Sequence, residues 1–330
     1  GLRPAQRCGS SQSDGASLAN MTGTSRKTIA ITGATGFVGS RMLDLVVREG
    51  YDARALARRK QDDRPNVTWV GGALDDPASL IALCTGADMV LHIAGVVNAP
   101  DRAGFEAGNV AGTLAVIEAA KQAGTKRFIH VSSLAATQPQ LSVYGETKAK
   151  AEKIVATSGL DWTIIRPPAV YGPGDGEFLD LFKMARLGFV TLPPDADGLL
   201  SVIHVQDLCQ ALLALLPEQE DFTAQIFEVD DGKPGGWTQA DFAKAIGQAI
   251  GKRVATVGIP KSLLRFAAKA DRLARGDKAK LTADRVNYFC HDDWVIDPQR
   301  RLPTQLWQPQ IETRQGLKDT ATWYRHNDWL

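Results

Sequence analysis

The sequence predicts an α/β fold in which a doubly wound parallel sheet carries helices on both faces, with a smaller lobe attached. Three observations favour this fold. Short apolar strands alternate with helical stretches, glycines join the first strand to the first helix, and small or polar residues recur where strands end. Strands that alternate with helices pair in parallel through right-handed crossovers. Their carboxyl ends then meet at one edge of the sheet, where ligands bind.

The first strand and the turn after it are the most informative stretch. Thr28–Ile31 is a short, apolar and partly β-branched run. Three glycines at three-residue spacing follow it: Gly33, Gly36 and Gly39. A predicted helix over Ser40–Val47 comes next, so backbone N–H groups and a helix N-terminus face one point, which suits a pyrophosphate. We expect side chains at the three glycines to block that approach; a plain tight turn is the alternative interpretation.

The remaining elements continue the alternation. The expected strands are Asp52–Ala57, Val67–Val70, Met89–Ile93, Arg127–Val131, Asp161–Ile165 and Gln225–Val229, with a short strand at Ser201–Val205. The expected helices are Pro77–Cys84, Asn109–Gln122, Tyr144–Ser158, Gln206–Leu216, Gln239–Ile250 and Lys261–Leu273.

These elements predict a division into domains. We assign residues 26–171 and 201–235 to a nucleotide-binding domain, and residues 172–200 and 236–330 to a smaller, mostly helical substrate lobe. Residues 1–25 are rich in Gly, Ser, Gln and Asn and are expected to be a disordered tail, or in part a remnant that precedes a natural start at Met21.

Composition excludes several classes of protein. A net charge of +1 argues against a nucleic-acid partner, because no excess of cations exists to neutralise phosphates. The four cysteines are scattered without a C-x-x-C pair, which favours a reducing compartment. No apolar run approaches the ~20 residues that span a bilayer. The histidines show no metal-ligand spacing, so no metal is expected. We expect a soluble, cytoplasmic protein without stable membrane insertion.

Tyr144 and Lys148 are the first candidates for chemistry. They lie four residues apart on a predicted helix, so their side chains share one face. A free phenol has a pKa near ~10, and a nearby ammonium lowers it. Ser133, at the end of the preceding strand, can donate a hydrogen bond to a substrate oxygen. Around a nicotinamide, these three residues form a site for moving a hydride to or from a carbonyl. The alternative is an ordinary surface pair.

Several motifs in order make the chain resemble the extended short-chain dehydrogenase/reductase family, of the NAD-dependent epimerase/dehydratase kind. The resemblance covers about Thr28 to Val229. It rests on TGATGFVG at Thr32–Gly39, LHIAG at Leu91–Gly95, NVAGT at Asn109–Thr113, VSS at Val131–Ser133, YGETK at Tyr144–Lys148, RPPAVYGPGD at Arg166–Asp175 and IHVQDL at Ile203–Leu208.

The resemblance implies a Rossmann-type domain, a nicotinamide cofactor and a small-molecule substrate. It implies a catalytic group of Ser133, Tyr144 and Lys148, with Asn109 supporting the active-site helix and its water network. The cofactor contacts that it implies come from Gly33, Thr35, Gly36, Phe37, Val38, Arg58, Leu74, Ala94, Gly95, Val131, Tyr144, Lys148, Pro167, Ala169 and Val170. The sequence departs from the family at Ala73, which follows Gly72 where an aspartate often contacts adenine, and at Gln206 in the His204–Asp207 motif.

The end of the second strand favours NADP(H) over NAD(H). NAD-binding enzymes usually carry an acid there, to hold the ribose hydroxyls. Here Ala57 is followed by three basic residues, Arg58–Lys60, and no carboxylate occurs before Asp62. In similar reductases the position of Arg58 pairs with the 2′-phosphate, for which a guanidinium is well suited. A solvated basic turn is the alternative.

The predicted function is an NADP-dependent oxidoreductase that moves a hydride to or from the carbonyl or alcohol of a small organic substrate. Two alternatives stay open. One is a sugar-nucleotide epimerase or dehydratase that retains NAD, and the other is a non-catalytic NADPH-binding subunit of a larger complex. A homodimer through the helices at 109–122 and 144–158 is a further hypothesis. The basic stretch at 261–280 could contact a membrane or an acidic substrate, but a solvated helix face is the favoured interpretation.

Overall fold

The computed structural model describes residues 26–276, 279 and 281–330, so the predicted tail at 1–25 lies outside the described residues. A seven-stranded sheet lies at the centre of the larger part of the molecule, and its strands are in the order β11-β6-β5-β4-β1-β2-β3. Every pair in it is parallel. Its strands are β1 (Thr28–Thr32), β2 (Asp52–Ala57), β3 (Val67–Gly71), β4 (Met89–His92), β5 (Arg127–Val131), β6 (Asp161–Arg166) and β11 (Gln225–Glu228). The predicted doubly wound fold is confirmed.

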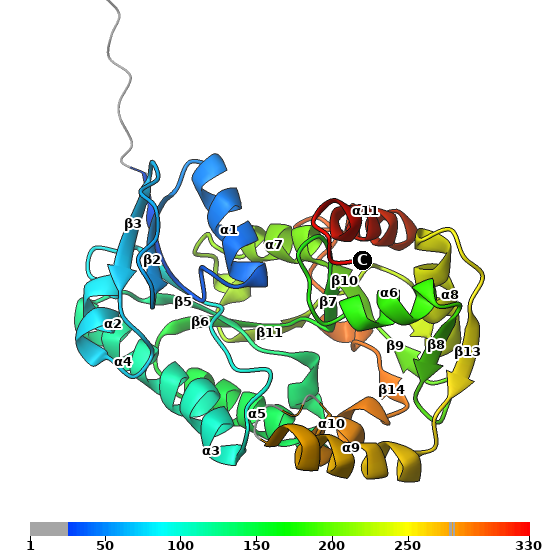
Figure 1. The fold of residues 1–330 in the computed structure, drawn as a ribbon. Coiled ribbons are helices and arrows are strands. Elements are labelled where there is room, and N and C mark those ends of the chain that lie inside the picture. Colours follow the sequence, from blue (N-terminus) through cyan, green and yellow to red (C-terminus); the bar gives the residue numbers. More distant parts are fainter. Residues whose placement is uncertain (1–25, 277–278, 280) are drawn as a thin grey trace, which may run out of the picture.

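Helices cover both faces of this sheet (Figure 1). They are α1 (Phe37–Arg48), α2 (Pro77–Cys84), α3 (Arg102–Phe105), the π-helix η1 (Glu106–Ala111), α4 (Gly112–Ala123), α5 (Val143–Ala156) and α7 (Val205–Ala214), with 3-10 turns η2 (Leu134–Thr137) and η3 (Glu220–Phe222). Alternate residues of β1 point to opposite faces: Ile29 and Ile31 pack with α1 and α7, and Ala30 packs with α2, α4 and α5. Strands buried on both faces explain the continuous apolar runs in the sequence.

The smaller lobe has its own apolar core, which includes Phe182, Phe242 and Tyr324. Its helices are α6 (Leu179–Arg186), α8 (Gln239–Ala249), α9 (Lys261–Arg275), α10 (Ala283–Phe289) and α11 (Thr313–His326), with the 3-10 turn η5 (Pro298–Arg300). Short strands that the sequence analysis did not predict join them: β8 (Phe189–Leu192) with β13 (Ala255–Gly258), and β9 (Leu199–Leu200) with β12 (Trp237–Thr238) and β14 (Asp293–Trp294). The predicted strand at 201–205 is β10 (Val202–His204), which pairs with β7 (Ala169–Tyr171) outside the main sheet.

Packing within the protein, and not only the approach of a ligand, requires glycine in the turn after β1. Gly33 has a φ of +72°, and a Cβ there would lie 2.7 Å from the Ala94 nitrogen. At Gly39 a Cβ would lie 1.9 Å from the Gly33 carbonyl oxygen, whereas at Gly36 that oxygen, at 3.3 Å, is the nearest atom. Packing of α1 and β4 against the turn therefore requires glycine at 33 and 39. Only Gly36 fits the expectation that a side chain would chiefly obstruct a ligand.

We predict that Gly39→Ala destabilises the protein by about 3 kcal/mol or more, because a methyl group would overlap backbone that cannot move freely. Urea unfolding measures the effect. Gly176→Ala is the matched control, since no atom lies within 4 Å of a Cβ at that position. Equal midpoints for the two variants would contradict the packing explanation.

Candidate active site

The carboxyl ends of β1, β4, β5 and β6 bring together segments that the sequence analysis placed at strand ends. The Ala94 N–H donates to the Thr32 hydroxyl oxygen at 3.2 Å, which holds the turn after β4 beside the glycine turn. The Leu134 N–H donates to the Pro167 carbonyl at 2.9 Å, which joins the ends of β5 and β6. This edge therefore collects the glycine turn, Gly95, Ser133 and Pro167 around one point.

The start of α1 fits a dinucleotide phosphate. Gly36 is the N-cap and contributes no side-chain oxygen, and no acidic residue lies in the first turn. The free backbone N–H groups at the N-terminus of α1, and the positive end of its helix dipole, are therefore available to an anion. Arg58 follows directly after β2, which pairs with β1, and it is exposed. Leu74 is half-buried and reaches the start of α4, where a Cβ on Gly112 would lie 2.8 Å from it. Of the other predicted cofactor contacts, Thr35 lies in the glycine turn, Phe37 and Val38 begin α1, Val131 ends β5, and Ala169 and Val170 lie on β7.

Tyr144 occupies the first turn of α5, a helix capped by the Ser142 hydroxyl, which accepts from the Gly145 N–H at 3.0 Å. Its hydroxyl is hydrogen-bonded to Ser133, which is itself buried. Burial raises the pKa of the Tyr144 phenol, and the bond to Ser133 opposes the rise. The expectation that Lys148 lowers this pKa is wrong for this structure, because the Lys148 ammonium is directed to another acceptor.

That acceptor is the Val131 carbonyl, which lies 2.8 Å from Lys148 Nζ. Lys148 is almost fully buried, and burial lowers its pKa to about 8, against the opposing charge of Glu152. The ammonium lies beneath the turn after β4: a Cβ on Gly95 would be 3.6 Å from it. Glycine at 95 therefore keeps the space above this cation open.

Asn109 holds the loop after β4 against α5. Its side-chain oxygen accepts from the Val96 N–H at 2.7 Å. Its amide donates to the Val96 carbonyl at 2.9 Å and to the Thr147 hydroxyl at 3.1 Å. The predicted helix at 109–122 begins earlier than expected, at Arg102, and its η1 segment is a π-helix, a distortion that is frequent at functional sites. The π turn places the Asn109 side chain between the loop and α5.

An ion-pair network behind α5 was not predicted. Arg166 on β6 donates to both oxygens of Glu152, at 2.9 and 2.7 Å, and to Glu228 on β11 at 3.1 Å. All three side chains are nearly buried. The Ser132 hydroxyl donates to Glu152 at 2.5 Å, which ties the network to the residue before Ser133. One feature of the sequence could have indicated this network: Glu152 lies four residues after Lys148, on the same face of the helix.

His92 and His130 are packed residues, as predicted, and they lie on the same face of the sheet as this network. Their rings stack at 5.3 Å, and both are fully buried. His92 lies 2.7 Å from the Thr32 hydroxyl and 3.0 Å from the Thr113 hydroxyl. Burial lowers the pKa of His92 to about 3 and that of His130 well below its usual value, with Lys148 adding to both. Two neutral rings therefore lie behind the Lys148 cation.

The smaller lobe also contributes to the site. The Tyr288 ring on α10 meets the Tyr144 ring edge-on, with centroids 6.5 Å apart. The Asp284 carboxylate at the start of α10 accepts from the Val143 N–H at 2.6 Å, which fixes α10 to the first turn of α5. No sequence motif surrounds Tyr288, so sequence reasoning missed it. Its ring lies against Tyr144 on the side of the smaller lobe.

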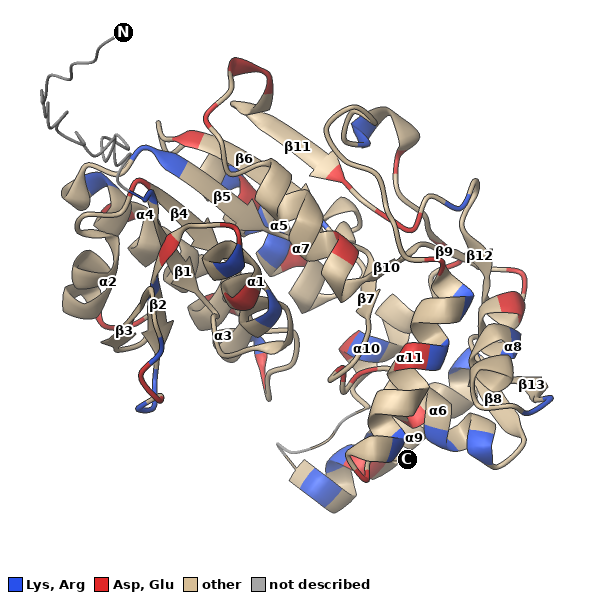
Figure 2. Ribbon diagram, turned by 90° about the horizontal axis from the view of Figure 1, so that it is seen from above, with Lys and Arg blue, Asp and Glu red and all other residues tan. Residues whose placement is uncertain are grey.

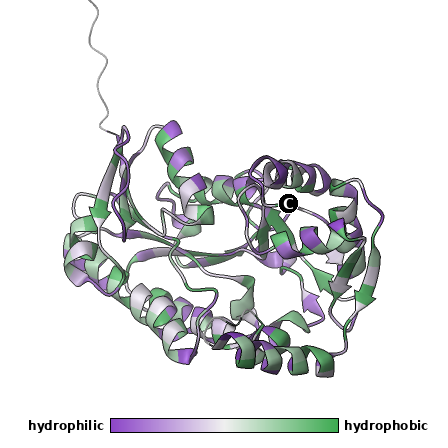
Figure 3. Cartoon of the chain, viewed as in Figure 1, coloured by the Kyte–Doolittle hydropathy of each residue, from purple (hydrophilic) through white to green (hydrophobic). Residues whose placement is uncertain are grey.

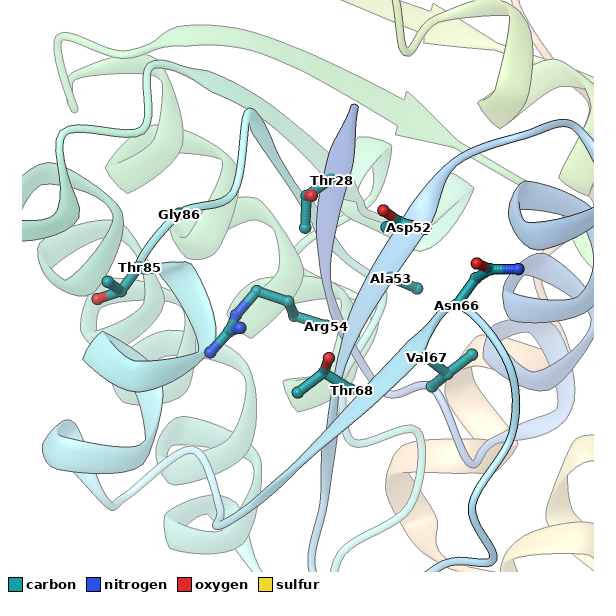
Figure 4. A pocket seen from close by; sticks show the side chains of 9 residues that line it. All are labelled: Thr28, Asp52, Ala53, Arg54, Asn66, Val67, Thr68, Thr85 and Gly86. Atoms are coloured by element: carbon teal, nitrogen blue, oxygen red, sulfur yellow. The ribbon is translucent and has the colours of Figure 1, made fainter. Parts of the chain in front are cut away.

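A separate hollow of about 390 Å³ lies at the opposite edge of the sheet (Figure 4). Its lining includes Thr28, Asp52 and Asn66, which lie at or near the amino ends of β1, β2 and β3. Arg54 in its wall is already bonded to the Leu83 and Ala82 carbonyls. This hollow is remote from Tyr144, so it is not the site described above.

Comparison with known proteins identifies the class. The model of the NAD dependent epimerase/dehydratase family matches residues 29–229. Ceramide reductase of Caulobacter vibrioides is 31% identical over 320 residues, which span 94% of this chain and 98% of that protein. The 4-hydroxy-2-methyl-3-oxo-4-farnesyl-3,4-dihydroquinoline-1-oxide ketoreductase of Stigmatella aurantiaca is 29% identical, over 62% of this chain and 68% of that one.

A solved structure shows the same fold. UDP-glucose 4-epimerase of Thermus thermophilus, in complex with NAD, superposes with a TM-score of 0.67 at 20% identity, covering 90% of this chain and 99% of that one. The chain belongs to the NAD dependent epimerase/dehydratase family, which confirms the predicted resemblance. Among the described residues, no helix combines the length and apolar character needed to cross a bilayer.

We predict that Arg166→Met lowers the free energy of unfolding by about 3–5 kcal/mol, because it leaves the Glu152 and Glu228 carboxylates buried without their cation. Chemical denaturation measures the loss. Arg48→Met replaces an exposed arginine at the far end of α1 and serves as the control. A loss no greater than that of the control would show that the network does not stabilise the fold.

Proposed function

We propose that this protein is an NADP-dependent oxidoreductase that reduces a carbonyl group to an alcohol through Ser133, Tyr144 and Lys148. The observation that carries the proposal is the Tyr144 phenol. It is hydrogen-bonded to Ser133 and lies at the edge of the sheet that holds the glycine turn. A phenol is protonated at neutral pH, so at this position Tyr144 can donate a proton to a substrate oxygen as negative charge develops there.

The residues at this edge fit a bound dinucleotide. We infer that the uncapped start of α1 and the glycine turn hold the pyrophosphate, and that Gly95 leaves room for the ribose above Lys148. Arg58 is proposed to pair with a 2′-phosphate, since its guanidinium is exposed beside the turn and no carboxylate intervenes before Asp62. When bound, a reduced nicotinamide supplies the hydride.

The chain's own residues supply the proton and the orientation. In the proposed reaction the Ser133 hydroxyl donates a hydrogen bond to the substrate carbonyl oxygen, which positions the carbon for attack. Tyr144 donates its phenolic proton to that oxygen as negative charge develops on it. The Lys148 ammonium, fixed 2.8 Å from the Val131 carbonyl, holds the ribose of the cofactor in this proposal. Asn109 keeps α5 and the loop after β4 in register for these steps.

The relatives suggest the substrate class. Both curated relatives described above are reductases, and the name of each includes a long apolar chain, a ceramide in one and a farnesyl group in the other. The aromatic wall that Tyr288 adds beside Tyr144 suits an apolar substrate. We propose a ketone attached to a long hydrocarbon chain, such as the oxidised form of a ceramide. The epimerase alternative is distinguished by its product, because epimerisation consumes no NADPH overall.

Replacing Arg58 tests cofactor preference. We predict that Arg58→Ala weakens NADPH binding by about tenfold or more and leaves NADH binding unchanged, because a charge-assisted pair to the 2′-phosphate contributes about 1.5–3 kcal/mol. Fluorescence titration with each cofactor measures both constants. Arg48→Ala should bind as the wild type does. If NADH binds wild-type protein as tightly as NADPH, the assignment of Arg58 is wrong.

Replacing Tyr144 separates chemistry from binding. We predict that Tyr144→Phe lowers kcat for ketone reduction by a factor of about 10² to 10⁴, the usual contribution of a general acid, while NADPH affinity stays within about twofold. Steady-state kinetics and the titration above measure the two quantities. Undiminished turnover in this variant would exclude Tyr144 as the proton donor.

The lowered pKa of Lys148 predicts a pH dependence. The ammonium loses its proton as the pH rises through about 8, so kcat/KM for NADPH should fall above that pH. Lys148→Arg retains its charge throughout this range and should remove the fall, whatever its absolute rate. Matched pH profiles of kcat/KM measure this, and an identical fall in both proteins would assign it to another group.

A further inference from the structure

Helix α9 presents two different faces. Leu264 and Ala268 are buried and pack with Val286 of α10 in a small separate cluster. Among the described residues, α10 is the principal contact of α9, so most of the helix surface is not covered (Figure 1). A solvated helix face, as the sequence analysis favoured, should be polar along this uncovered surface.

The uncovered surface is instead partly apolar. Leu263, Phe266 and Leu273 expose 55%, 69% and 89% of their surface. With the exposed Ala270 they recur at intervals of three or four residues, so they form one strip along the helix. Figure 3 shows strongly apolar residues on this outer helix. We call these four residues the apolar strip of α9.

A basic row runs beside the apolar strip. Arg265, Lys269 and Arg272 are exposed at intervals of four and three residues, which places them on a neighbouring face of the helix. Figure 2 shows basic residues on α9 in blue. Among the described residues none of the three forms an ion pair with a carboxylate. The single acid of the helix, Asp271, is turned inward, where it accepts from the Leu281 N–H at 3.0 Å and pairs with Arg275 at 3.2 Å.

We propose that α9 is a peripheral membrane-binding helix that docks on an anionic lipid surface. A strip of large apolar side chains flanked by unpaired cations is the pattern of helices that lie in the bilayer interface. The apolar strip enters the acyl boundary, and the basic row contacts lipid phosphates. The charge favours a membrane as the partner, because a row of exposed cations beside an apolar strip complements an extended anionic surface. This inference goes beyond the proposed function and does not depend on it.

The position of α9 gives the docking a consequence. The helix it packs on, α10, carries Tyr288 against Tyr144 and is bonded to the start of α5 through Asp284. A membrane held by α9 therefore lies on the side of the lobe that borders the reaction site. A substrate with a long hydrocarbon chain could pass from the bilayer to that site with limited exposure to water.

Vesicle flotation tests the proposal. Full-length protein is mixed with vesicles of phosphatidylcholine alone, or of phosphatidylcholine with about 30% phosphatidylglycerol, and the bound fraction is measured at low and high salt. We expect binding to the anionic vesicles and its loss at high salt, because salt screens the attraction of the cations, each of which strengthens binding by about fivefold at low salt. Binding equal on both vesicle types would overturn the role of the basic row.

Two variants and a matched control locate the surface. Two triple variants should each reduce binding to anionic vesicles by about tenfold or more. The glutamate variant combines Arg265→Glu, Lys269→Glu and Arg272→Glu. The serine variant combines Leu263→Ser, Phe266→Ser and Leu273→Ser. Leu187→Ser removes an apolar residue that is 72% exposed outside α9, and should bind vesicles as the wild type does. An unchanged midpoint of urea unfolding in every variant shows that the fold is intact.

The remaining outcomes are also decisive. Wild-type protein that binds no vesicle overturns the proposal, as does vesicle binding that survives both triple variants. A different result would assign the apolar strip to a contact between copies of this chain. In that case neither protein binds vesicles, and light scattering shows that the wild type is a dimer and the serine variant a monomer. Because none of these measurements uses turnover, their failure is separate from failure of the proposed reaction.

Discussion

The Arg166 guanidinium, held between two buried carboxylates, connects the parts of this molecule that must keep a fixed relation. Glu152 belongs to the helix that carries Tyr144 and Lys148, and Glu228 ends the edge strand of the sheet. The second oxygen of Glu228 accepts from the Asp297 N–H at 2.7 Å, so the chain that returns from the smaller lobe is tied to the same group. Breaking one member would leave charge without a partner in a region closed to water. The network therefore holds α5 in place against the sheet.

Fixing α5 determines the electrostatics of the site. Lys148 is held under the turn after β4 with a carboxylate one helical turn behind it and two neutral histidines in the neighbouring strands. Burial lowers the pKa of that ammonium and raises the pKa of the Tyr144 phenol. These opposite shifts keep the phenol protonated and bring Lys148 near its titration point around neutral pH. The protonated phenol is the form that can donate a proton in the proposed reaction.

Local patterns in the sequence predicted most of the sheet and the residues gathered at its edge. The seven main strands, the helix at 77–84 and the glycine turn all leave a period or a spacing in neighbouring residues. The short strands of the smaller lobe show no such period or spacing in the sequence. Leu199–Leu200 pairs with Trp237–Thr238 and with Asp293–Trp294, and strands of two residues are defined by such distant partners rather than by their own sequence. Arg166 and Tyr288 were missed as site residues for the same reason, because their importance arises from contacts across the fold.

The most direct test of the central claim follows the hydride. The protein is incubated with NADPH deuterated at the transferable position and a ketone bearing a long hydrocarbon chain, such as oxidised ceramide, and the product is analysed by mass spectrometry. The account predicts one deuterium on the new alcohol carbon for each NADPH consumed, with the signal lost in Tyr144→Phe and retained in Arg48→Ala. An unlabelled ketone without NADPH consumption, together with epimerisation of a sugar nucleotide at no net cost of cofactor, would contradict it.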